Sequence, residues 1–208
     1  KEEAAAAAGA TTGHCGGGRD VDDGDHLLLL LSTLLLQMYA SCESIEDAQS
    51  LFSAEPSCKR DVVAWNTLLA LHHHSSATQL HLFHNMMLHS HLVTPNRATF
   101  LIALSACQSE AFSDEGLLLH SLILEQTTNT GLIHDAILGT GLVSMYGRCK
   151  SVEDAWESFN RISSRDVVAW NAIITVYAQN GHESIAIRLF QLFSQDGLSP
   201  NKVTYLVI

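Results

Sequence analysis

The chain has 208 residues, 47% of them hydrophobic and only three of them prolines, so it can bury a sizeable core and favours helices over a turn-rich β fold. Its formal net charge of −11 argues against the basic footprint of a nucleic-acid-binding protein. The five cysteines lack CxxC spacing, which argues against a disulfide framework and against a zinc ribbon, and indicates free thiols.

Residues 1–27 are rich in alanine, glycine and acidic residues, and no repeat or fold can be assigned to them. They lack the arginine- and serine-rich composition of a transit peptide, so we expect any targeting segment to lie further upstream. The apolar run that follows, "HLLLLLSTLLLQMY", is interrupted by Ser32, Thr33 and Gln37. It is shorter than the roughly 18–20 residues of a membrane span, so no membrane association is expected.

An internal repeat organises the remainder. The hexapeptide "DVVAWN" occurs at 61–66 and again at 166–171, and 11 of the 24 residues from 29 to 52 match those from 136 to 159. A third kind of unit lies between the two copies. Units of about 30–40 residues predict a solenoid of helical hairpins, because one hairpin cannot bury its apolar face alone. We expect an unassigned segment followed by five units and the start of a sixth, at 1–27, 28–60, 61–95, 96–134, 135–165, 166–200 and 201–208.

Each unit is expected to contain two helices. The fourth unit has apolar residues at helical spacing on one face of its first helix. Ser151 followed by Asp154 then resembles a capping box that starts a second helix, as do Ser44 and Asp47 in the first unit. The expected buried face consists of Leu138, Leu142, Val143, Met145 and Tyr146.

The fifth unit predicts helices over 167–179 and 183–195, joined by a turn at Asn180–Gly181. Gly197 and Pro200 are expected to end it. Asp61 and Asp166 stand where helix N-caps are wanted. In the second unit "HHHSSAT" replaces the turn, and the second helix is expected to begin two residues earlier. The predicted fold is all-α, an α-solenoid of stacked helix-turn-helix repeats forming a right-handed superhelix.

The pattern A-x-x-x-F at 48–52, 155–159 and 186–190 is shared with tetratricopeptide repeats, but here asparagine directly follows Trp65 and Trp170. "DVVAWNAIITVYAQNGHESIAIRLFQLFSQDGLSPN" resembles the standard repeat of plant pentatricopeptide repeat (PPR) proteins of the PLS subfamily. "ATFLIALSACQSEAFSDEGLLLHSLIL", with Gly116 and His120, resembles their long repeat. "GTGLVSMYGRCKSVEDAWESFNRISSRD" resembles their short repeat. The resemblance covers 28–208, and the chain is interpreted as a fragment.

The resemblance implies binding of single-stranded RNA with one base read per repeat. One reading residue lies in the first turn of a repeat's first helix, and the other lies at the end of the same repeat. A further residue clamps the face of each base. The implied pairs are Thr33/Asp61, Asn66/Asn96, Leu101/Asp135, Thr140/Asp166 and Asn171/Asn201. The implied clamping residues are Leu30, Val63, Ala98, Ile137 and Val168.

Several of these residues also permit a structural interpretation. Asn66 and Asn171 could cap or bridge neighbouring repeats, and Trp65 and Trp170 are expected in the core rather than stacked on bases. Cys42 and Cys149 occupy one repeat position and are expected to be small buried fillers. The histidines could suggest a metal site, but they lack acidic or cysteine partners, so we expect solvated side chains at His72, His73, His74, His81, His84, His89 and His91.

No catalytic residue, metal or other cofactor is expected, because H-x-E and P-C-x-x-C, the zinc signature of deaminases, are both absent from the sequence. The family resemblance implies a specificity module of an organelle RNA-editing (C-to-U) or RNA-processing factor in mitochondria or chloroplasts. Its expected partners are single-stranded organelle RNA and editing-complex proteins, and the chain is expected to be a monomer. The alternative is a protein-binding scaffold, since α-solenoids also hold peptides in their concave groove.

Overall fold

The computed structural model describes residues 23–54, 61–88, 93–128 and 135–207, and its secondary structure there is helical throughout. The expectations for residues 1–22, for His89 and His91, and for Cys15 and Cys58 lie outside this part. The α-helices are α1 (Asp23–Ser41), α2 (Ile45–Ala54), α3 (Val62–Leu71), α4 (Ser76–Leu88), α5 (Arg97–Ala106), α6 (Ser113–Thr128), α7 (Ala136–Arg148), α8 (Val152–Arg161), α9 (Val167–Gln179), α10 (Glu183–Gln195) and α11 (Lys202–Val207), with a 3₁₀ turn η2 at Glu110–Phe112.

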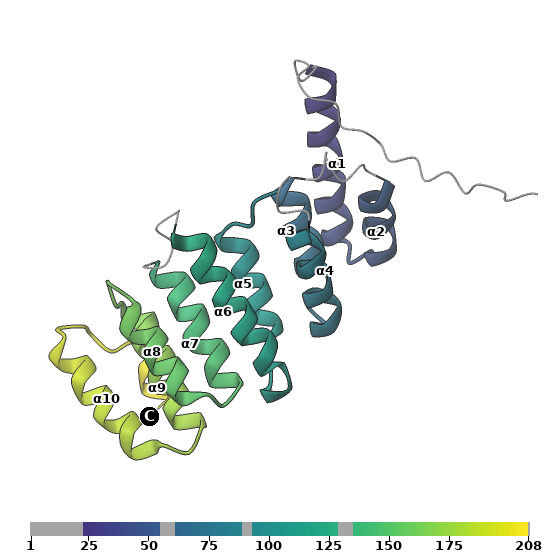
Figure 1. Cartoon of the computed structure of the whole chain (residues 1–208). Helices are drawn as coiled ribbons and strands as arrows, with labels where there is room; N and C mark the ends of the chain where they lie inside the picture. Colours follow the sequence, from purple (N-terminus) through teal and green to yellow (C-terminus); the bar gives the residue numbers. More distant parts are fainter. Residues whose placement is uncertain (1–22, 55–60, 89–92, 129–134, 208) are drawn as a thin grey trace, which may run out of the picture.

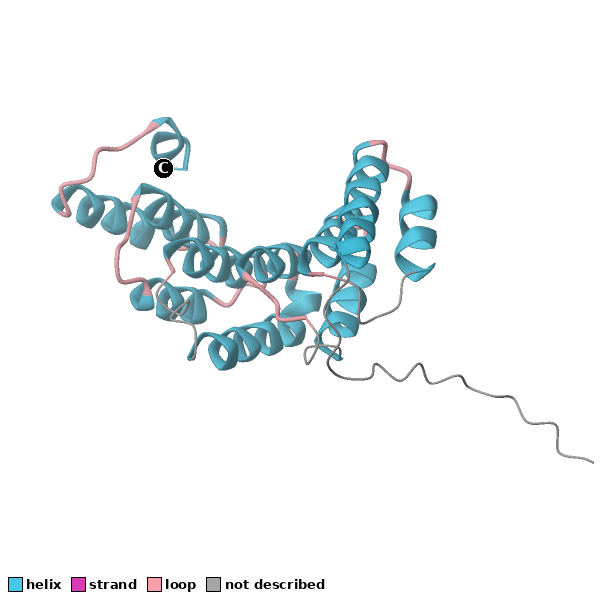
Figure 2. Cartoon of the chain, turned by 90° about the horizontal axis from the view of Figure 1, so that it is seen from above, coloured by secondary structure: helices cyan, strands magenta, loops and turns pink. Residues whose placement is uncertain are grey.

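The helices follow one another as hairpins in a row that runs from α1 to α10 (Figure 1). The odd-numbered helices form a continuous layer, because α1 packs on α3, α3 on α5, α5 on α7, α7 on α9 and α9 on α11. Seen from above, the row is an arc (Figure 2). This arrangement confirms the predicted α-solenoid. Within the described ranges, no helix is both long and apolar enough to cross a bilayer.

The fifth unit shows how local sequence fixes the helix ends. Both of its helices have the bounds expected from the sequence, 167–179 and 183–195. Asp166 caps α9, since its Oδ1 accepts the Ala169 N–H at 2.8 Å, and Asp61 caps α3 in the same way. Gly181 and Gly197 end the helices with φ of +82° and +74°, a region that glycine enters without a steric penalty.

Repeat-equivalent aromatic residues form the core between hairpins. Trp65 and Trp170 are 3% and 4% exposed, which confirms that they are core residues. Each meets a phenylalanine edge to face, with ring centroids 4.8 Å apart for Phe52 and Trp65 and 4.9 Å apart for Phe159 and Trp170. The predicted apolar face of α7 is buried in full. The buried side chains of successive hairpins therefore form one continuous hydrophobic cluster.

Helix packing is closest where α7 meets α9. A Cβ built on Gly147 would lie 2.3 Å from Cγ2 of Val176. The first copy of the repeat has Ala40 and Leu71 at the two equivalent positions. Position 147 therefore favours glycine, because the side chain of Val176 occupies the space that a Cβ would take.

A polar cluster ties α6, α7 and α8 together. His120 Nδ1 shares a hydrogen bond of 2.6 Å with the Tyr146 hydroxyl, and Arg161 lies beside the other ring nitrogen. Burial and the nearby Arg161 charge lower the pKa of His120 from its ordinary value. Burial also raises the pKa of Tyr146 to about 12. The cluster is therefore built for a neutral imidazole.

Three local predictions were wrong. His72 is buried rather than solvated, because it ends α3 under α2, where Nδ1 bonds the Leu68 carbonyl at 2.8 Å and Nε2 bonds the Gln49 amide at 2.9 Å. Cys42 is exposed, although the equivalent Cys149 is buried as expected. The serine hydroxyls of the two expected capping boxes point to the carboxylates of Asp47 and Asp154, and Ser151 makes no side-chain cap bond to α8.

The second unit also departs from the fifth as the sequence indicated. Helix α4 begins at Ser76, two residues before the position equivalent to the start of α10, and α3 ends at Leu71. Helix α9 continues further than α3 before it ends. In the second unit the buried His72 and Gln79 take the place of that last part, and the Gln79 amide donates to the Leu69 carbonyl at 3.1 Å.

Candidate nucleic-acid interface

The residues expected to read RNA alternate between two structural positions. Thr33, Asn66, Leu101, Thr140 and Asn171 lie on the odd-numbered helices α1, α3, α5, α7 and α9. Their partners Asp61, Asn96, Asp135, Asp166 and Asn201 each stand directly before the next odd-numbered helix. Because the odd-numbered helices pack side by side, each pair spans the seam between two consecutive hairpins.

The first asparagine pair is joined by a network of hydrogen bonds. Asn66 Nδ2 donates to Asn96 Oδ1 at 3.2 Å. Asn96 also caps α5, since its Oδ1 accepts the Thr99 N–H at 3.1 Å and its own N–H donates to Thr99 Oγ1 at 3.1 Å. The Thr99 hydroxyl donates to Asn66 Oδ1 at 2.7 Å. Three residues from two repeats are thus held in one arrangement.

The second asparagine pair repeats this arrangement with one bond missing. Asn171 Nδ2 donates to Asn201 Oδ1 at 3.3 Å, and Asn201 forms the same reciprocal cap with Thr204. The Thr204 hydroxyl lies 3.1 Å from Asn201 Oδ1. Asn171 is only 7% exposed, and its Oδ1 accepts no hydrogen bond within the described part of the chain. A buried acceptor without a donor is costly, and no hydroxyl holds this amide in the way that Thr99 holds Asn66.

The sequence analysis did not identify Thr99 and Thr204. A signal was present, because "NRAT" and "NKVT" both place threonine three residues after the capping asparagine. The three aspartate-capped helices have Ala64, Leu138 and Ala169 at that position instead. The threonine therefore accompanies asparagine caps only, where its hydroxyl completes a capping box.

The aspartates of the other three pairs all serve as N-caps, and Asp135 has a further partner. Its Oδ2 binds Arg97 at 2.9 Å, while Oδ1 accepts the Leu138 N–H. Burial acts to raise the pKa of Asp135, but the Leu138 bond and the Arg97 guanidinium outweigh it, and the pKa is lowered. Arg97 thus binds the second carboxylate oxygen, for which Asp61 and Asp166 have no hydrogen bond to another described residue. Thr140, which pairs with Asp166, donates to the Ala136 carbonyl.

The expected clamping residues are all exposed apolar side chains on the odd-numbered helices, and all except Leu30 lie in the first turn. Leu30, Val63, Ile137 and Val168 are 49%, 42%, 53% and 61% exposed, and Ala98 is also exposed. A groove of about 550 Å³ contains Val63 and Asn66 and is bounded on the other side by Gln37 and Ala40 of α1.

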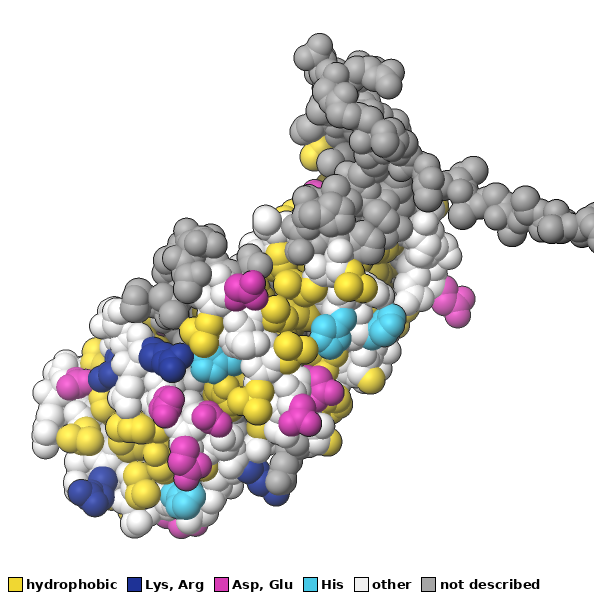
Figure 3. Space-filling model, viewed as in Figure 1, with side chains coloured by type: hydrophobic (Ala, Val, Ile, Leu, Met, Phe, Trp, Pro, Cys, Tyr) yellow, Lys and Arg dark blue, Asp and Glu magenta, His cyan; other side chains and the backbone are white. Residues whose placement is uncertain are grey.

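Lysine and arginine are few in the sequence, with 11 of them against 22 acidic residues. On the face shown in Figure 3, Lys and Arg form separate spots rather than a continuous stripe. Phosphate contacts supply most of the salt-dependent affinity for nucleic acid. The acidic net charge therefore predicts little attraction for phosphates.

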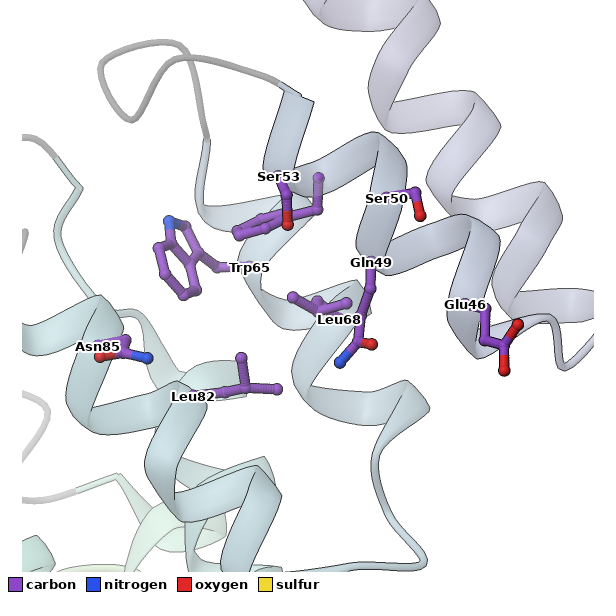
Figure 4. Close-up of a pocket in the computed structure, with 9 residues that line it drawn as sticks. Glu46, Gln49, Ser50, Ser53, Trp65, Leu68, Leu82 and Asn85 are labelled. Carbon is purple, nitrogen blue, oxygen red and sulfur yellow. The ribbon is translucent and has the colours of Figure 1, made fainter. Parts of the chain in front are cut away.

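A second cavity, of about 660 Å³, lies between α2, α3 and α4 (Figure 4). Its lining includes Gln49, Trp65 and Asn85. In the fourth and fifth units the equivalent positions hold Trp156 and Phe190, and Trp156 stacks on Phe159 and meets Tyr177 edge to face. The cavity is therefore a packing gap left by two smaller polar residues, and no cluster of metal-binding side chains occurs among the described residues.

A row of packed helical hairpins defines a helical-repeat protein. Comparison with known proteins specifies the kind. A PPR repeat family model matches residues 165–208. Among the relatives, CRR2 of Arabidopsis thaliana, named chloroplastic, is 34% identical over 182 residues, which is 86% of this chain and 26% of that protein. A pentatricopeptide repeat-containing protein of the same plant, named mitochondrial, is 32% identical over 178 residues, 85% of this chain and 27% of that protein.

Solved structures show the same fold. The pentatricopeptide repeat protein PPR10 in complex with an 18-nt psaJ RNA element superposes with a TM-score of 0.66 at 20% identity, covering 85% of this chain and 26% of that one. PPR10 from maize superposes with a TM-score of 0.67. The chain belongs to the pentatricopeptide repeat family. It spans about a quarter of the length of the curated relatives described here.

Proposed function

We propose that the chain binds single-stranded RNA, with one base read at each seam between hairpins, as the specificity module of an organelle RNA-editing or RNA-processing factor of the PLS subfamily. The observation that carries the proposal is the pair of asparagine bridges, 66/96 and 171/201, each beside an exposed apolar residue on the same helix. An amide pair beside an apolar surface suits a base, which has a hydrogen-bonding edge and a flat face. The RNA complex of PPR10 supports this proposal.

The proposed readers are the five pairs, and each type suits a different base. Asp61 and Asp166 have a carboxylate oxygen for the ring N–H and amine of guanine, beside Thr33 and Thr140. The asparagine pairs suit a pyrimidine, with cytosine above uracil. Leu101 has no polar atom in its side chain and Asp135 is bound to Arg97, so the third seam has no assigned base. With the protein running N to C along RNA running 5′ to 3′, the footprint is G, pyrimidine, any base, G, pyrimidine.

The repeat boundaries at 28, 61, 96, 135, 166 and 201 belong to this proposal, as do a monomeric state and contacts with editing-complex proteins. The relatives named chloroplastic and mitochondrial favour one of these two organelles. The chain is proposed to act without a catalytic group of its own. Any chemistry on the RNA would be supplied by another domain or by a partner protein.

The test compares two five-nucleotide RNAs of identical composition, 5′-GCAGC-3′ and 5′-CGACG-3′, which differ only by exchange of G and C at the read positions. Fluorescence anisotropy at low ionic strength should show tighter binding of the first by at least tenfold, since four seams are mismatched in the second at about 1–3 kcal/mol each. Equal binding of both RNAs, or none, would contradict base reading and would favour a protein-binding scaffold. The composition match removes charge and length as explanations.

A further inference from the structure

We infer that Thr99 is a specificity-determining residue of the Asn66/Asn96 seam, because its hydroxyl fixes which atoms of Asn66 face a base. This inference rests on the proposed function and names a residue outside the reading pair. Thr99 lies on α5, is fully buried, and belongs to the repeat that follows Asn66. It cannot touch a base in the groove itself and would act as a positioning residue.

The orientation of both amides follows from one backbone donor. The Thr99 N–H must be accepted by an oxygen, so Asn96 directs Oδ1 into the helix end and its amino group outward. Asn66 lies against that same oxygen, so it directs its nitrogen toward Asn96. The Asn66 oxygen is then left facing α5, where the Thr99 hydroxyl binds it at 2.7 Å.

This arrangement presents donors to the groove. Asn96 offers its amino hydrogens and Asn66 offers its remaining amide hydrogen, while the Asn66 oxygen is held by Thr99. Two adjacent donors match two adjacent acceptors, and the Watson–Crick edge of cytosine has such a pair in N3 and O2. Uracil presents an N–H between its two carbonyls and needs an acceptor at this place. Thr99 therefore favours cytosine over uracil by engaging the oxygen that would accept the uracil N–H.

The second asparagine seam is an internal comparison. Thr204 is equivalent to Thr99, but the Asn171 oxygen accepts no bond within the described residues. Because no hydroxyl holds that buried oxygen, the Asn171 amide can turn it toward the groove, where it would accept the N–H of uracil. The fifth nucleotide should therefore accept cytosine and uracil more evenly than the second, although the two reading pairs are identical in sequence.

The experiment measures binding of the 208-residue chain to 5′-GCAGC-3′ and 5′-GUAGC-3′. The native chain should prefer cytosine at the second nucleotide by about fivefold, the typical effect of one hydrogen bond. Thr99→Val should remove most of this ratio, and Thr99→Ser, which keeps the hydroxyl, should retain it. Thr204→Val is the matched control, because it removes the same capping hydroxyl one triplet later and leaves the ratio at the second nucleotide unchanged.

The outcomes separate this inference from the function on which it rests. If the native chain distinguishes 5′-GCAGC-3′ from 5′-CGACG-3′ but shows no preference for cytosine at the second nucleotide, the role of Thr99 is refuted and base reading stands. The same conclusion follows if Thr99→Val keeps the full preference. Absence of binding to every RNA overturns the proposed function and the inference together. An equal loss of affinity for both pyrimidines in Thr99→Val, with Thr99→Ser unaffected, shows a cap that only stabilises α5 and overturns the inference alone.

Discussion

Replacing Asp166 by asparagine separates its two roles, helix cap and base reader. The cap should survive, because Asn96 and Asn201 already cap equivalent helices with Oδ1 accepting a backbone N–H at 3.1 and 3.0 Å, against 2.8 Å for Asp166. Aspartate and asparagine are about equally good N-caps. The free energy of unfolding should therefore change by no more than about 0.5 kcal/mol. The atom facing the groove, however, changes from an acceptor to a donor.

The base preference at the fourth nucleotide should follow that atom. A carboxylate oxygen accepts from guanine, whereas an amino group donates to N1 of adenine, so Asp166→Asn should move the preference from guanine to adenine. Contacts of this kind contribute about 1–3 kcal/mol, which corresponds to roughly 5- to 150-fold in affinity. The assay uses four RNAs, 5′-GCAXC-3′, and urea unfolding of both proteins. An equal loss for all four bases would refute the reasoning and would leave Asp166 as a helix cap alone.

Three further predictions concern the scaffold. Phe159→Ala should lower the free energy of unfolding by about 4 kcal/mol, and Phe52→Ala by about 1 kcal/mol less, because Phe159 also stacks on Trp156 whereas Phe52 borders the open cavity; equal losses in urea would contradict this. Gly147→Ala should cost about 1–3 kcal/mol, despite the better helix propensity of alanine, and Val176→Ala should restore part of the loss if contact with Val176 is the cause. Burial and Arg161 lower the pKa of His120, so the stability that the neutral imidazole contributes is present above about pH 6.5 and is lost as the pH falls through the folded pKa. His120→Gln should flatten this pH dependence of the free energy of unfolding. An NMR titration midpoint of His120 above about 6.5 would contradict the lowered pKa.

A structural feature could be predicted from the sequence where the residues that determine it lie within one unit. The bounds of α9 and α10 follow from Asp166, Gly181 and Gly197, all within the same unit, and the structure has them as expected. The burial of Trp65 and Trp170 follows from a repeated position on a helix face. These features recur in each copy, so a repeat in the sequence is enough to indicate them.

The features that could not be predicted depend on partners in another unit. His72 is buried beside Gln49, 23 residues earlier, whose amide nitrogen donates to its Nε2, whereas the equivalent Tyr177 meets Trp156. The bond from Thr99 to Asn66 crosses 33 residues and two repeats. Residue identity at either end gives no indication of such a contact, because it depends on how closely the two hairpins pack. The difference between the Asn66 and Asn171 seams was therefore visible only in the structure.

The central claim is that each seam reads one base, and selection from a random RNA pool tests it most directly. RNAs with five consecutive randomised nucleotides would be bound to the immobilised chain at low ionic strength, eluted and sequenced. The account predicts enrichment of guanine at the first and fourth positions and of pyrimidines at the second and fifth. It predicts no enrichment at the third, where Leu101 lies beside the Arg97–Asp135 ion pair. A bound pool whose base frequencies match the input at all five positions would contradict the account.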